Sequence, residues 1–224
     1  LRLTAIVNPH ARITAEIDGE VTVFERVANE VPPCPKSILP HPHGIEFGAL
    51  KRLAAASTGT VEEFLIGSFS RVGKKTADEM IALAGLKPTQ KVKKLEPEEL
   101  TRLLDAMQAV KVPAPPAQQC LSPIGEDLIC KGLEKEIQLD FIKARTRPSM
   151  VYGGHPFIIE AAIGYGGKIP PEGSAQIFRF ANRVPLLYQQ GACAITNCVS
   201  QVNWKNYGLS QQGLPMGPVL IMVH

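Results

Sequence analysis

Residues 67–88 decide how the first half of this chain folds, and they read Gly67-Ser-Phe-Ser-Arg-Val-Gly-Lys-Lys-Thr-Ala-Asp-Glu-Met-Ile-Ala-Leu-Ala-Gly-Leu-Lys-Pro88. The apolar residues in the second half of this stretch follow the spacing i, i+3, i+4, i+7, which predicts one buried face of a helix. Those residues are Ala77, Met80, Ile81 and Ala84. Gly85 then stands where helices commonly end in a left-handed residue, so we expect the helix to stop there.

The predicted helix begins next to Gly73, which has no side chain to keep another molecule at a distance. The first turn of a helix leaves backbone N–H groups unpaired, and together with the helix dipole they attract anions. Arg71, Lys74 and Lys75 surround this start with positive charge. This combination is typical of a site for the phosphate backbone of a nucleic acid.

The positive charge of the chain is concentrated here. Residues 67–94 hold seven basic residues against two acidic ones, a net charge of +5, whereas all 224 residues sum to +3. The basic residues, which we take with Gly73 as candidate DNA-binding residues, are Arg71, Lys74, Lys75, Lys87, Lys91, Lys93 and Lys94. The alternative is a helical bundle whose basic face is simply solvated.

Helices on both sides of this stretch complete a small helical domain. We expect one near 46–56, a short one that opens with the capping box Thr60-Val-Glu-Glu63, and a last one that starts at Glu96-Pro97. Residues 87–94 form a basic connector. Over about 44–112 the pattern resembles a helix-two-turn-helix module, which DNA glycosylases of the formamidopyrimidine type and a small-subunit ribosomal protein use to hold nucleic-acid backbones.

Composition bounds the class of protein. The chain is 45% hydrophobic and 20% charged, and its 19 prolines include two clusters, at 31–42 and 112–123, which predict linkers between packed units. Five cysteines without a Cys-x-x-Cys pair favour neither a disulfide framework nor a zinc site, so we expect a reducing, intracellular location. No apolar run reaches the roughly 18 residues of a membrane span and no signal peptide is evident, so no membrane partner is expected.

The rest of the chain predicts strands and helices. Asp18-Gly19 between two alternating runs indicates a β-hairpin. A helix is expected over 124–137 and a short one over 192–202. Strands are expected over 157–165, 175–184 and 219–223, the last buried on both faces. The fold class is therefore α+β multidomain, with a β-hairpin remnant, a small helical domain and an incomplete α/β layer. Because the chain starts without Met and ends inside an apolar run, we expect it to be a fragment.

Two further patterns resemble a metal site and a phosphate-binding loop but do not favour either. His41 and His43 lie in a proline-rich loop without a third ligand, so a structural role is favoured over a metal site. Two glycine-rich stretches, 67–76 and 164–168, depart from the spacing of a phosphate-binding loop. We therefore expect no catalytic, metal or cofactor-binding residue within this chain.

Five longer stretches together resemble the B-subunit family of DNA topoisomerase VI. They are Thr4-Ala-Ile-Val-Asn-Pro-His-Ala11, Leu39-Pro-His-Pro-His-Gly44, Cys120-Leu-Ser-Pro-Ile-Gly-Glu126, Gly154-His-Pro-Phe157, and Arg179-Phe-Ala-Asn-Arg-Val-Pro-Leu-Leu-Tyr-Gln-Gln-Gly191. The resemblance implies that 1–31 is the tail of a GHKL ATPase domain and 44–112 a helix-two-turn-helix domain. Residues 124–224 would then be a truncated transducer domain of ribosomal-S5-like type, with linkers at 32–43 and 113–123.

The resemblance also implies a function. Members of this family join a DNA-cleaving A subunit in an A2B2 heterotetramer that passes one DNA duplex through a double-strand break in another. ATP closes the two B subunits, and the transducer carries this closure to the A subunit, which cuts with a tyrosine and magnesium. The ATP-binding motifs would lie before Leu1 and the transducer lysine after His224. The resemblance thus implies ATP and Mg²⁺ as cofactors of the full-length protein. It also implies that the protein is located in the cytoplasm or nucleoid of a prokaryote, or in the nucleus of a eukaryote.

One family element linked to DNA contact, Trp-Lys-x-Tyr, matches Trp204-Lys205-Asn206-Tyr207. Two interpretations stay open for it, because Trp204 and Tyr207 suit either a DNA contact, together with Lys205, or one packed helical face. Two other functions are also open. A non-catalytic B-like scaffold of a recombination complex would differ only in the sequence before Leu1. A glycosylase would need a catalytic N-terminal amine and usually a zinc finger, for which the cysteine pairs are lacking.

Overall fold

The computed structural model describes residues 1–115 and 120–224, so the middle of the expected linker 113–123 lies outside the described residues. The chain divides into two compact units, which we call the sheet unit and the helical unit. The sheet unit comprises Leu1–Pro33, Pro123–Arg147 and Ile159–His224. The helical unit comprises Cys34–Ser122 and Pro148–Ile158. Each unit is described by itself.

The helical unit contains the helices that the sequence predicts. They are α2 (Phe47–Ala56), α3 (Val61–Ser68), α4 (Lys74–Ala84), the 3-10 turn η1 (Val92–Lys94) and α5 (Pro97–Ala109). Their ends follow the predicted capping chemistry. The Thr60 hydroxyl accepts from the Glu63 N–H and the Glu63 carboxylate accepts from the Thr60 N–H, at 3.3 and 2.8 Å, so the capping box is confirmed. Gly85 ends α4 in the left-handed region at φ 66°, also as predicted.

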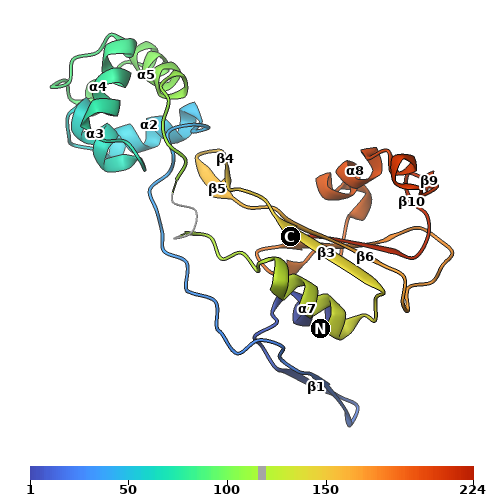
Figure 1. Ribbon diagram of the computed structural model, residues 1–224. Helices are drawn as coiled ribbons and strands as arrows, with labels where there is room; N and C mark the ends of the chain where they lie inside the picture. The colour runs from blue at the N-terminus through green and yellow to red at the C-terminus, as the bar shows by residue number, and fades with distance from the viewer. Residues whose placement is uncertain (116–119) are drawn as a thin grey trace. The chain divides into compact units, whose positions relative to one another are not determined.

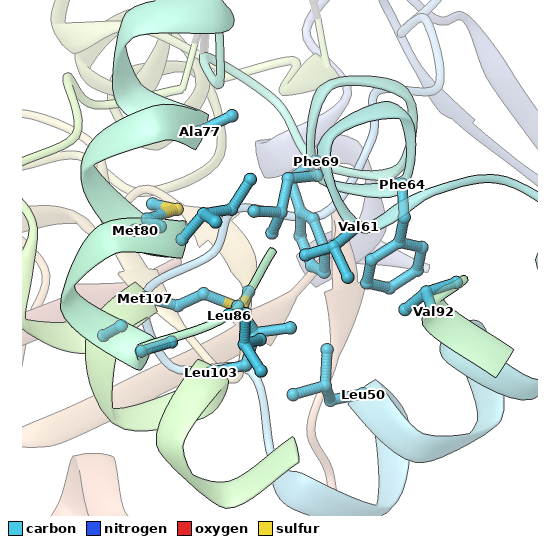
Figure 2. Packing of buried hydrophobic residues seen from close by; sticks show 14 of the residues in the cluster. Leu50, Val61, Phe64, Phe69, Ala77, Met80, Leu86, Val92, Leu103 and Met107 are labelled. Atoms are coloured by element: carbon cyan, nitrogen blue, oxygen red, sulfur yellow. The ribbon is translucent and has the colours of Figure 1, made fainter. Parts of the chain in front are cut away.

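One hydrophobic core holds these helices together (Figure 2). It contains the predicted buried face of α4, together with apolar residues of α2 and α5. Leu50, Met80 and Leu103 are among its members with fully buried side chains. The rings of Phe64 and Phe69 meet edge to face with their centroids 5.6 Å apart. Because each helix of the unit contributes to the same core, the turn between α3 and α4 is held at both ends.

The helical unit also contains a hairpin from the second half of the chain, formed by β4 (Met150–Tyr152) and β5 (His155–Phe157). Its turn is made by Gly153 and Gly154, both with positive φ, at a position where the sequence predicts a turn or bulge. The His41 N–H donates to the Gly154 carbonyl at 2.7 Å. The hairpin tip is therefore hydrogen-bonded to the proline-rich segment that precedes α2.

Both histidine rings of that proline-rich segment lie within hydrogen-bond distance of backbone carbonyls. His41 is buried, and its Nδ1 accepts from the His43 N–H at 3.2 Å, which leaves Nε2 to donate to the Pro113 carbonyl at 3.0 Å. The other ring, of His43, lies 2.8 Å from the Val110 carbonyl through Nε2. Burial is the main cause that lowers the pKa of His41, so the ring is held neutral.

The sheet unit is built on five strands in the order β3-β6-β11-β7-β8 (Figure 1). Their bounds are Phe141–Thr146, Glu160–Tyr165, Val219–Val223, Gln176–Ala181 and Val184–Pro185. The central strand β11 runs antiparallel to β6 and parallel to β7, so the sheet is mixed. Four of its five residues are buried, which confirms the prediction of a strand covered on both faces.

Helices cover the two faces of this sheet differently. On one face α1 (Arg2–Val7) and α7 (Glu126–Glu136) pack over Ala144, Phe180 and Met222. On the other face α8 (Ala194–Gln201) and the 3-10 turn η3 (Trp204–Tyr207) pack over Val219 and Ile221 (Figure 1). The remaining short elements are β9 (Gln211–Gln212), β10 (Leu214–Pro215), the 3-10 turn η2 (Gln190–Ala192) and the hairpin β1 (Ile13–Ile17) with β2 (Glu20–Phe24).

Two predicted strands are interrupted in the structure. The expected strand 157–165 divides into β5 and β6, because Ile158 and Ile159 lie between a hairpin of one unit and a strand of the other. The expected strand 175–184 turns back on itself at Asn182 and Arg183, both at positive φ, and continues as β8. Helix α1 and edge strand β3 were not predicted, since α1 is short and β3 alternates lysine and arginine with apolar residues.

Candidate nucleic-acid interface

The start of α4 is the centre of the candidate interface. The chain ends α3 at Ser68, turns through Arg71, which has a left-handed φ of 61°, and begins α4 at Lys74 after the N-cap Gly73. Apart from Gly73 itself and its two chain neighbours, no atom lies within 4 Å of the position that a Cβ at Gly73 would occupy. Gly73 is in the extended region at φ −97°, so the fold itself makes no demand for glycine here. Gly73 is the N-cap residue, so this open position directly precedes the first turn of α4.

The charged side chains around this start are exposed. Arg71, Lys74 and Lys75 are all on the surface. Lys74 also makes an ion pair with Glu62 at 3.2 Å, although its side chain is 76% exposed. Such exposed pairs contribute little to stability and are easily exchanged, so Lys74 can turn to a phosphate at small cost. Glu62 was not singled out from the sequence, since a partner twelve positions away on another helix leaves no local signal.

The second half of the basic segment lies beside the first turn of α3. The Val61 N–H donates to the Gln90 carbonyl at 2.9 Å and the Glu62 N–H to the Pro88 carbonyl at 3.3 Å. The ammonium group of Lys91 donates to the Thr58 carbonyl at 3.2 Å. Glu62 therefore contacts both halves of the basic segment 67–94. Its side chain pairs with Lys74 in the first half, and its backbone N–H bonds to residues 87–91 in the second. The structure brings together the two parts of the basic segment that the sequence places more than ten residues apart.

The remaining candidates of this segment, Lys87, Lys93 and Lys94, are exposed as well. Lys93 and Lys94 lie in η1, whose Val92 side chain is buried in the core of the unit. The connector is thus ordered and fixed by an apolar anchor.

The Trp-Lys-x-Tyr element lies in the sheet unit, and the structure separates its two aromatic residues. Trp204 is 8% exposed, packs against Val199 and Ile221, and donates its indole N–H to the Val199 carbonyl at 2.8 Å. Tyr207 is 72% exposed, and Lys205 is exposed beside it. The two rings are 6.1 Å apart. Trp204 is therefore a core residue that holds η3, and Tyr207 and Lys205 are the members that face solvent.

The glycine-rich turn at 164–168 is filled by its own chain. The Gly167 N–H donates to the Asp140 carboxylate at 2.8 Å, and a Cβ at Gly167 would lie 2.0 Å from the Gln138 carbonyl oxygen. The backbone N–H of Gly167 is thus already hydrogen-bonded to a carboxylate of the chain itself. Among the residues that the structure describes, no three His, Cys, Asp or Glu side chains gather as ligands for a metal ion. Within the same residues, no helix is both long and apolar enough to cross a membrane.

Fold and site together define an α+β protein with a helical unit that presents a basic helix start and a unit built on a five-stranded mixed sheet. Residues 116–224 match the family described as "Topoisomerase VI B subunit, transducer". The whole chain is 50% identical, over 228 residues, to the B subunit of type 2 DNA topoisomerase 6 from Methanococcoides burtonii. That match covers 100% of this chain and 36% of the relative.

Two more distant relatives carry the same name. The protein of Archaeoglobus fulgidus is 44% identical and that of Metallosphaera sedula 37% identical, each over 100% of this chain and over 38% and 42% of the relative. The chain belongs to the family of DNA topoisomerase VI B subunits, as the sequence motifs indicate, and the comparisons do not favour a glycosylase. It spans somewhat more than a third of the length of these relatives.

Proposed function

We propose that this chain is the part of a topoisomerase VI B subunit that binds the backbone of double-stranded DNA and transmits ATP-driven closure to a DNA-cleaving A subunit. The observation that carries the proposal is the identity of 50% along the whole chain to a relative named as this component of the enzyme. ATP and Mg²⁺ would act in the full-length protein, in a part of it outside these residues. Its partners would be the A subunits of an A2B2 assembly, together with a second B subunit, inside the cell at the nucleoid.

Within this assembly, the helical unit would serve as the helix-two-turn-helix domain. Its contact with DNA would centre on Gly73, Arg71, Lys74 and Lys75, with Lys87, Lys91, Lys93 and Lys94 extending the surface. The support is local: a helix start open to a foreign backbone, exposed cations on both sides of Glu62, and no side chain over Gly73. Cations of this kind neutralise phosphates irrespective of base sequence, so the binding is expected to be sequence-independent.

A second contact would come from the sheet unit through Lys205 and Tyr207, positioned by the buried Trp204. A lysine beside an exposed aromatic ring suits a sugar-phosphate backbone, because the ammonium group pairs with phosphate while the ring packs against sugar. The role of Trp204 in this contact is indirect.

The proposal is tested by fluorescence anisotropy of two unrelated DNA duplexes at several salt concentrations. The double variant Lys74→Glu/Lys75→Glu should bind both duplexes more weakly and with a flatter salt dependence. A site of about two to four phosphates gives a log-log slope near −0.9 per phosphate, so each lost contact flattens it by about one.

The matched control is Lys51→Glu/Arg52→Glu, which makes the same change of charge on exposed residues of α2 in the same unit. If the two double variants lower affinity equally, the effect is one of net charge and the start of α4 is not a binding site.

A further inference from the structure

One face of the five-stranded sheet is covered over only part of its width. Directly paired residues of neighbouring strands point to the same face. On this face the pairing aligns Val219, Tyr165 and Phe141 in one row, and Ile221, Ile163 and Lys143 in the next. Helix α8 and η3 pack over Val219 and Ile221 in β11, on the side of the sheet away from α7 (Figure 1). The rest of each row, in β6 and β3, lies outside this packed cluster.

The uncovered residues are large, and their side chains are open to solvent. Phe141 is 56% exposed, Tyr165 46% and Ile163 41%. The two cations of β3 on the same face, Lys143 and Arg145, are exposed as well. We call these five residues the β3–β6 surface. All of them belong to the sheet unit.

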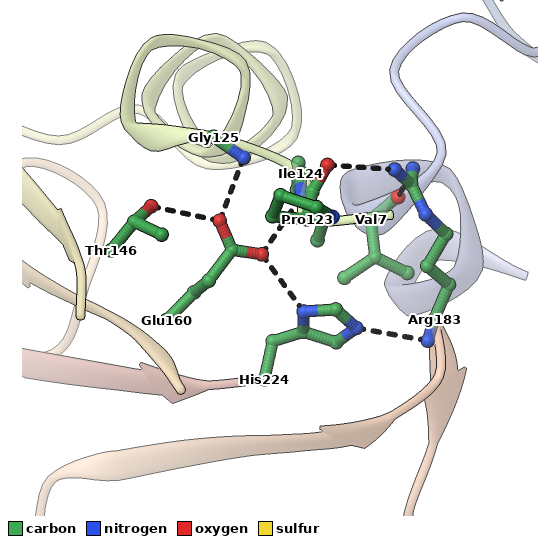
Figure 3. Close-up of polar contacts among 8 residues, drawn as sticks. All are labelled: Val7, Pro123, Ile124, Gly125, Thr146, Glu160, Arg183 and His224. Atoms are coloured by element: carbon green, nitrogen blue, oxygen red, sulfur yellow. Dashed lines mark hydrogen bonds and ion pairs between the residues drawn. The ribbon is translucent and has the colours of Figure 1, made fainter. Parts of the chain in front are cut away.

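The opposite face of the same two strands is closed by α7, and the buried Glu160 of β6 holds the start of this helix there (Figure 3). Glu160 Oε2 accepts from the Ile124 N–H at 2.7 Å and from His224 Nδ1 at 3.0 Å. Oε1 accepts from the Gly125 N–H at 2.7 Å and from the Thr146 hydroxyl at 2.9 Å. Burial by itself would raise the pKa of Glu160, but these hydrogen bonds outweigh it and bring the pKa to about 2. The carboxylate is therefore charged at neutral pH, and α7 stays bound to its side of the sheet.

The β3–β6 surface carries positive charge. None of the residues that β3 and β6 direct to this face is acidic. Arg145 pairs with Glu126 at 3.6 Å, but its side chain is 80% exposed, and such pairs are easily exchanged. The carboxylate of Asp140, which precedes Phe141, already accepts from the Gly167 N–H. The surface is therefore complementary to an anionic partner.

Protection of the sheet edge explains only part of this pattern. β3 is an edge strand, and charged residues on such a strand discourage pairing with another chain. That role accounts for Lys143 and Arg145. It does not account for the exposed rings of Phe141 and Tyr165, which are directly paired between β3 and β6. Neighbouring exposed apolar side chains with charged residues beside them are typical of a binding surface.

Two neighbouring rings and two cations match a chain of unpaired nucleotides. An unpaired base can stack on an aromatic side chain while its phosphate pairs with lysine or arginine, and open sheets that carry aromatic residues bind single strands in this way. In a duplex the bases already stack on one another, so the two rings would find no base to contact.

We propose that the β3–β6 surface binds single-stranded DNA, with bases stacked on Phe141 and Tyr165 and phosphates at Lys143 and Arg145. DNA is the nucleic acid on which this family of topoisomerase subunits is named to act. The inference goes beyond the proposed function, which assigns the backbone of duplex DNA to other residues. It depends on the sheet unit alone, so it holds for any placement of the helical unit.

The test measures the anisotropy of a labelled oligothymidylate of about 12 nucleotides, a length within the usual range of single-strand sites. All variants carry Lys74→Glu/Lys75→Glu, so that the start of α4 contributes little to binding. Phe141→Leu and Tyr165→Leu keep an apolar side chain but remove the ring. Each should weaken binding by about fivefold or more, the lower end for one stacked base. Phe141→Tyr keeps a ring and should retain the affinity.

Tyr188→Leu is the control for the rings, because Tyr188 is an exposed tyrosine of the same unit that lies outside the β3–β6 surface. It should bind the oligonucleotide as the background protein does.

The cations have a separate readout. Lys143→Gln/Arg145→Gln should flatten the log-log salt dependence by about 1.4, since each phosphate contact on a single strand contributes about 0.7. Arg26→Gln/Lys131→Gln removes an exposed arginine and an exposed lysine elsewhere in the unit and should leave the slope nearly unchanged.

Unchanged affinity in both leucine variants would overturn the proposal, and so would an equal loss in Tyr188→Leu. The proposal is also wrong if the background protein binds a duplex of the same length as tightly as the single strand, since charge alone would then explain the binding. If the leucine variants fail to fold, photocrosslinking of the parent chain to an oligonucleotide that contains iododeoxyuridine decides. Crosslinks must then include Phe141 or Tyr165, and crosslinks confined to other residues overturn the proposal. The proposed duplex contact is tested at Lys74 and Lys75, so the two proposals fail separately.

Discussion

The backbone N–H of His41 and the carbonyl of Gly154 are joined by a hydrogen bond of 2.7 Å. The bond links the proline-rich segment before α2 to the tip of the β4–β5 hairpin, two segments that are far apart in the sequence. Glycines make this close approach possible. A Cβ at Gly154 would lie 3.2 Å from the His41 carbonyl oxygen, and a Cβ at Gly44 would lie 3.1 Å from the Gly153 nitrogen.

Gly154→Ala should therefore destabilise the helical unit more than its backbone strain alone explains. Gly208→Ala is the control, since both glycines have nearly the same φ, +79° and +77°, but Gly208 has no atom within 4 Å of its Cβ position. Alanine at such a φ costs about 1–2 kcal/mol, which both variants share. Urea unfolding should show an additional loss for Gly154→Ala, with faster exchange of the His41 amide. Equal losses in the two variants would mean that the hairpin tip is not held by this contact.

Gly73→Ala should weaken DNA binding without disturbing the fold. The site has room for a methyl group, so the melting temperature should change little, while the methyl group would keep a phosphate away from the first N–H groups of α4. We expect a loss of about 1 kcal/mol in binding free energy, about fivefold in Kd. Gly67→Ala in α3 is the control, because its Cβ position is equally open but lies inside a helix. Unaltered affinity in Gly73→Ala would contradict the contact.

The two aromatic residues of η3 should respond differently to truncation. Trp204→Ala removes a buried ring and an indole hydrogen bond and should cost about 3–5 kcal/mol of stability, measured by chemical unfolding. Tyr207→Ala removes an exposed ring and should change stability by about 0.5 kcal/mol or less while it lowers DNA affinity. Tyr188 is 85% exposed in the same unit, so Tyr188→Ala is the control and should lower neither stability nor DNA affinity. A Tyr207 variant that binds DNA like the Tyr188 variant would remove Tyr207 from the interface.

Glu160 should make the sheet unit sensitive to acid in a defined window. Its pKa of about 2 in the folded chain lies below the ordinary 4.5, so its contribution to stability is present above pH 4.5 and is lost as the pH falls toward 2. The difference corresponds to a contribution on the order of 3 kcal/mol. Between pH 5 and 2 the unfolding free energy should fall less steeply with pH in Glu160→Gln than in the parent. The reason is that the variant takes up about one proton fewer on unfolding. Parallel curves for parent and variant would show that this carboxylate is not the group that titrates.

Local chemistry is the reason that much of the helical unit could be predicted from the sequence. The face of α4, the capping box at Thr60 and the left-handed end at Gly85 each depend on residues within a few positions of one another. The hairpin at Asp18-Gly19 and the buried strand β11 follow from equally local patterns of turn residues and apolar runs. The basic start of α4 belongs to the same group, because Gly73, Lys74 and Lys75 are neighbours in the chain.

The parts that escaped prediction depend on partners distant in sequence. Packing between elements decides that Lys74 pairs with Glu62 and that Trp204 is buried while Tyr207 is exposed. It also decides that the β4–β5 hairpin belongs to the helical unit. Glu160 shows the physical reason most clearly. Glutamate is seldom fully buried unless it is paired, and no local pattern marks Glu160 as an exception. Only the folded chain brings two backbone N–H groups, a hydroxyl and an imidazole to the place where its charge can be buried.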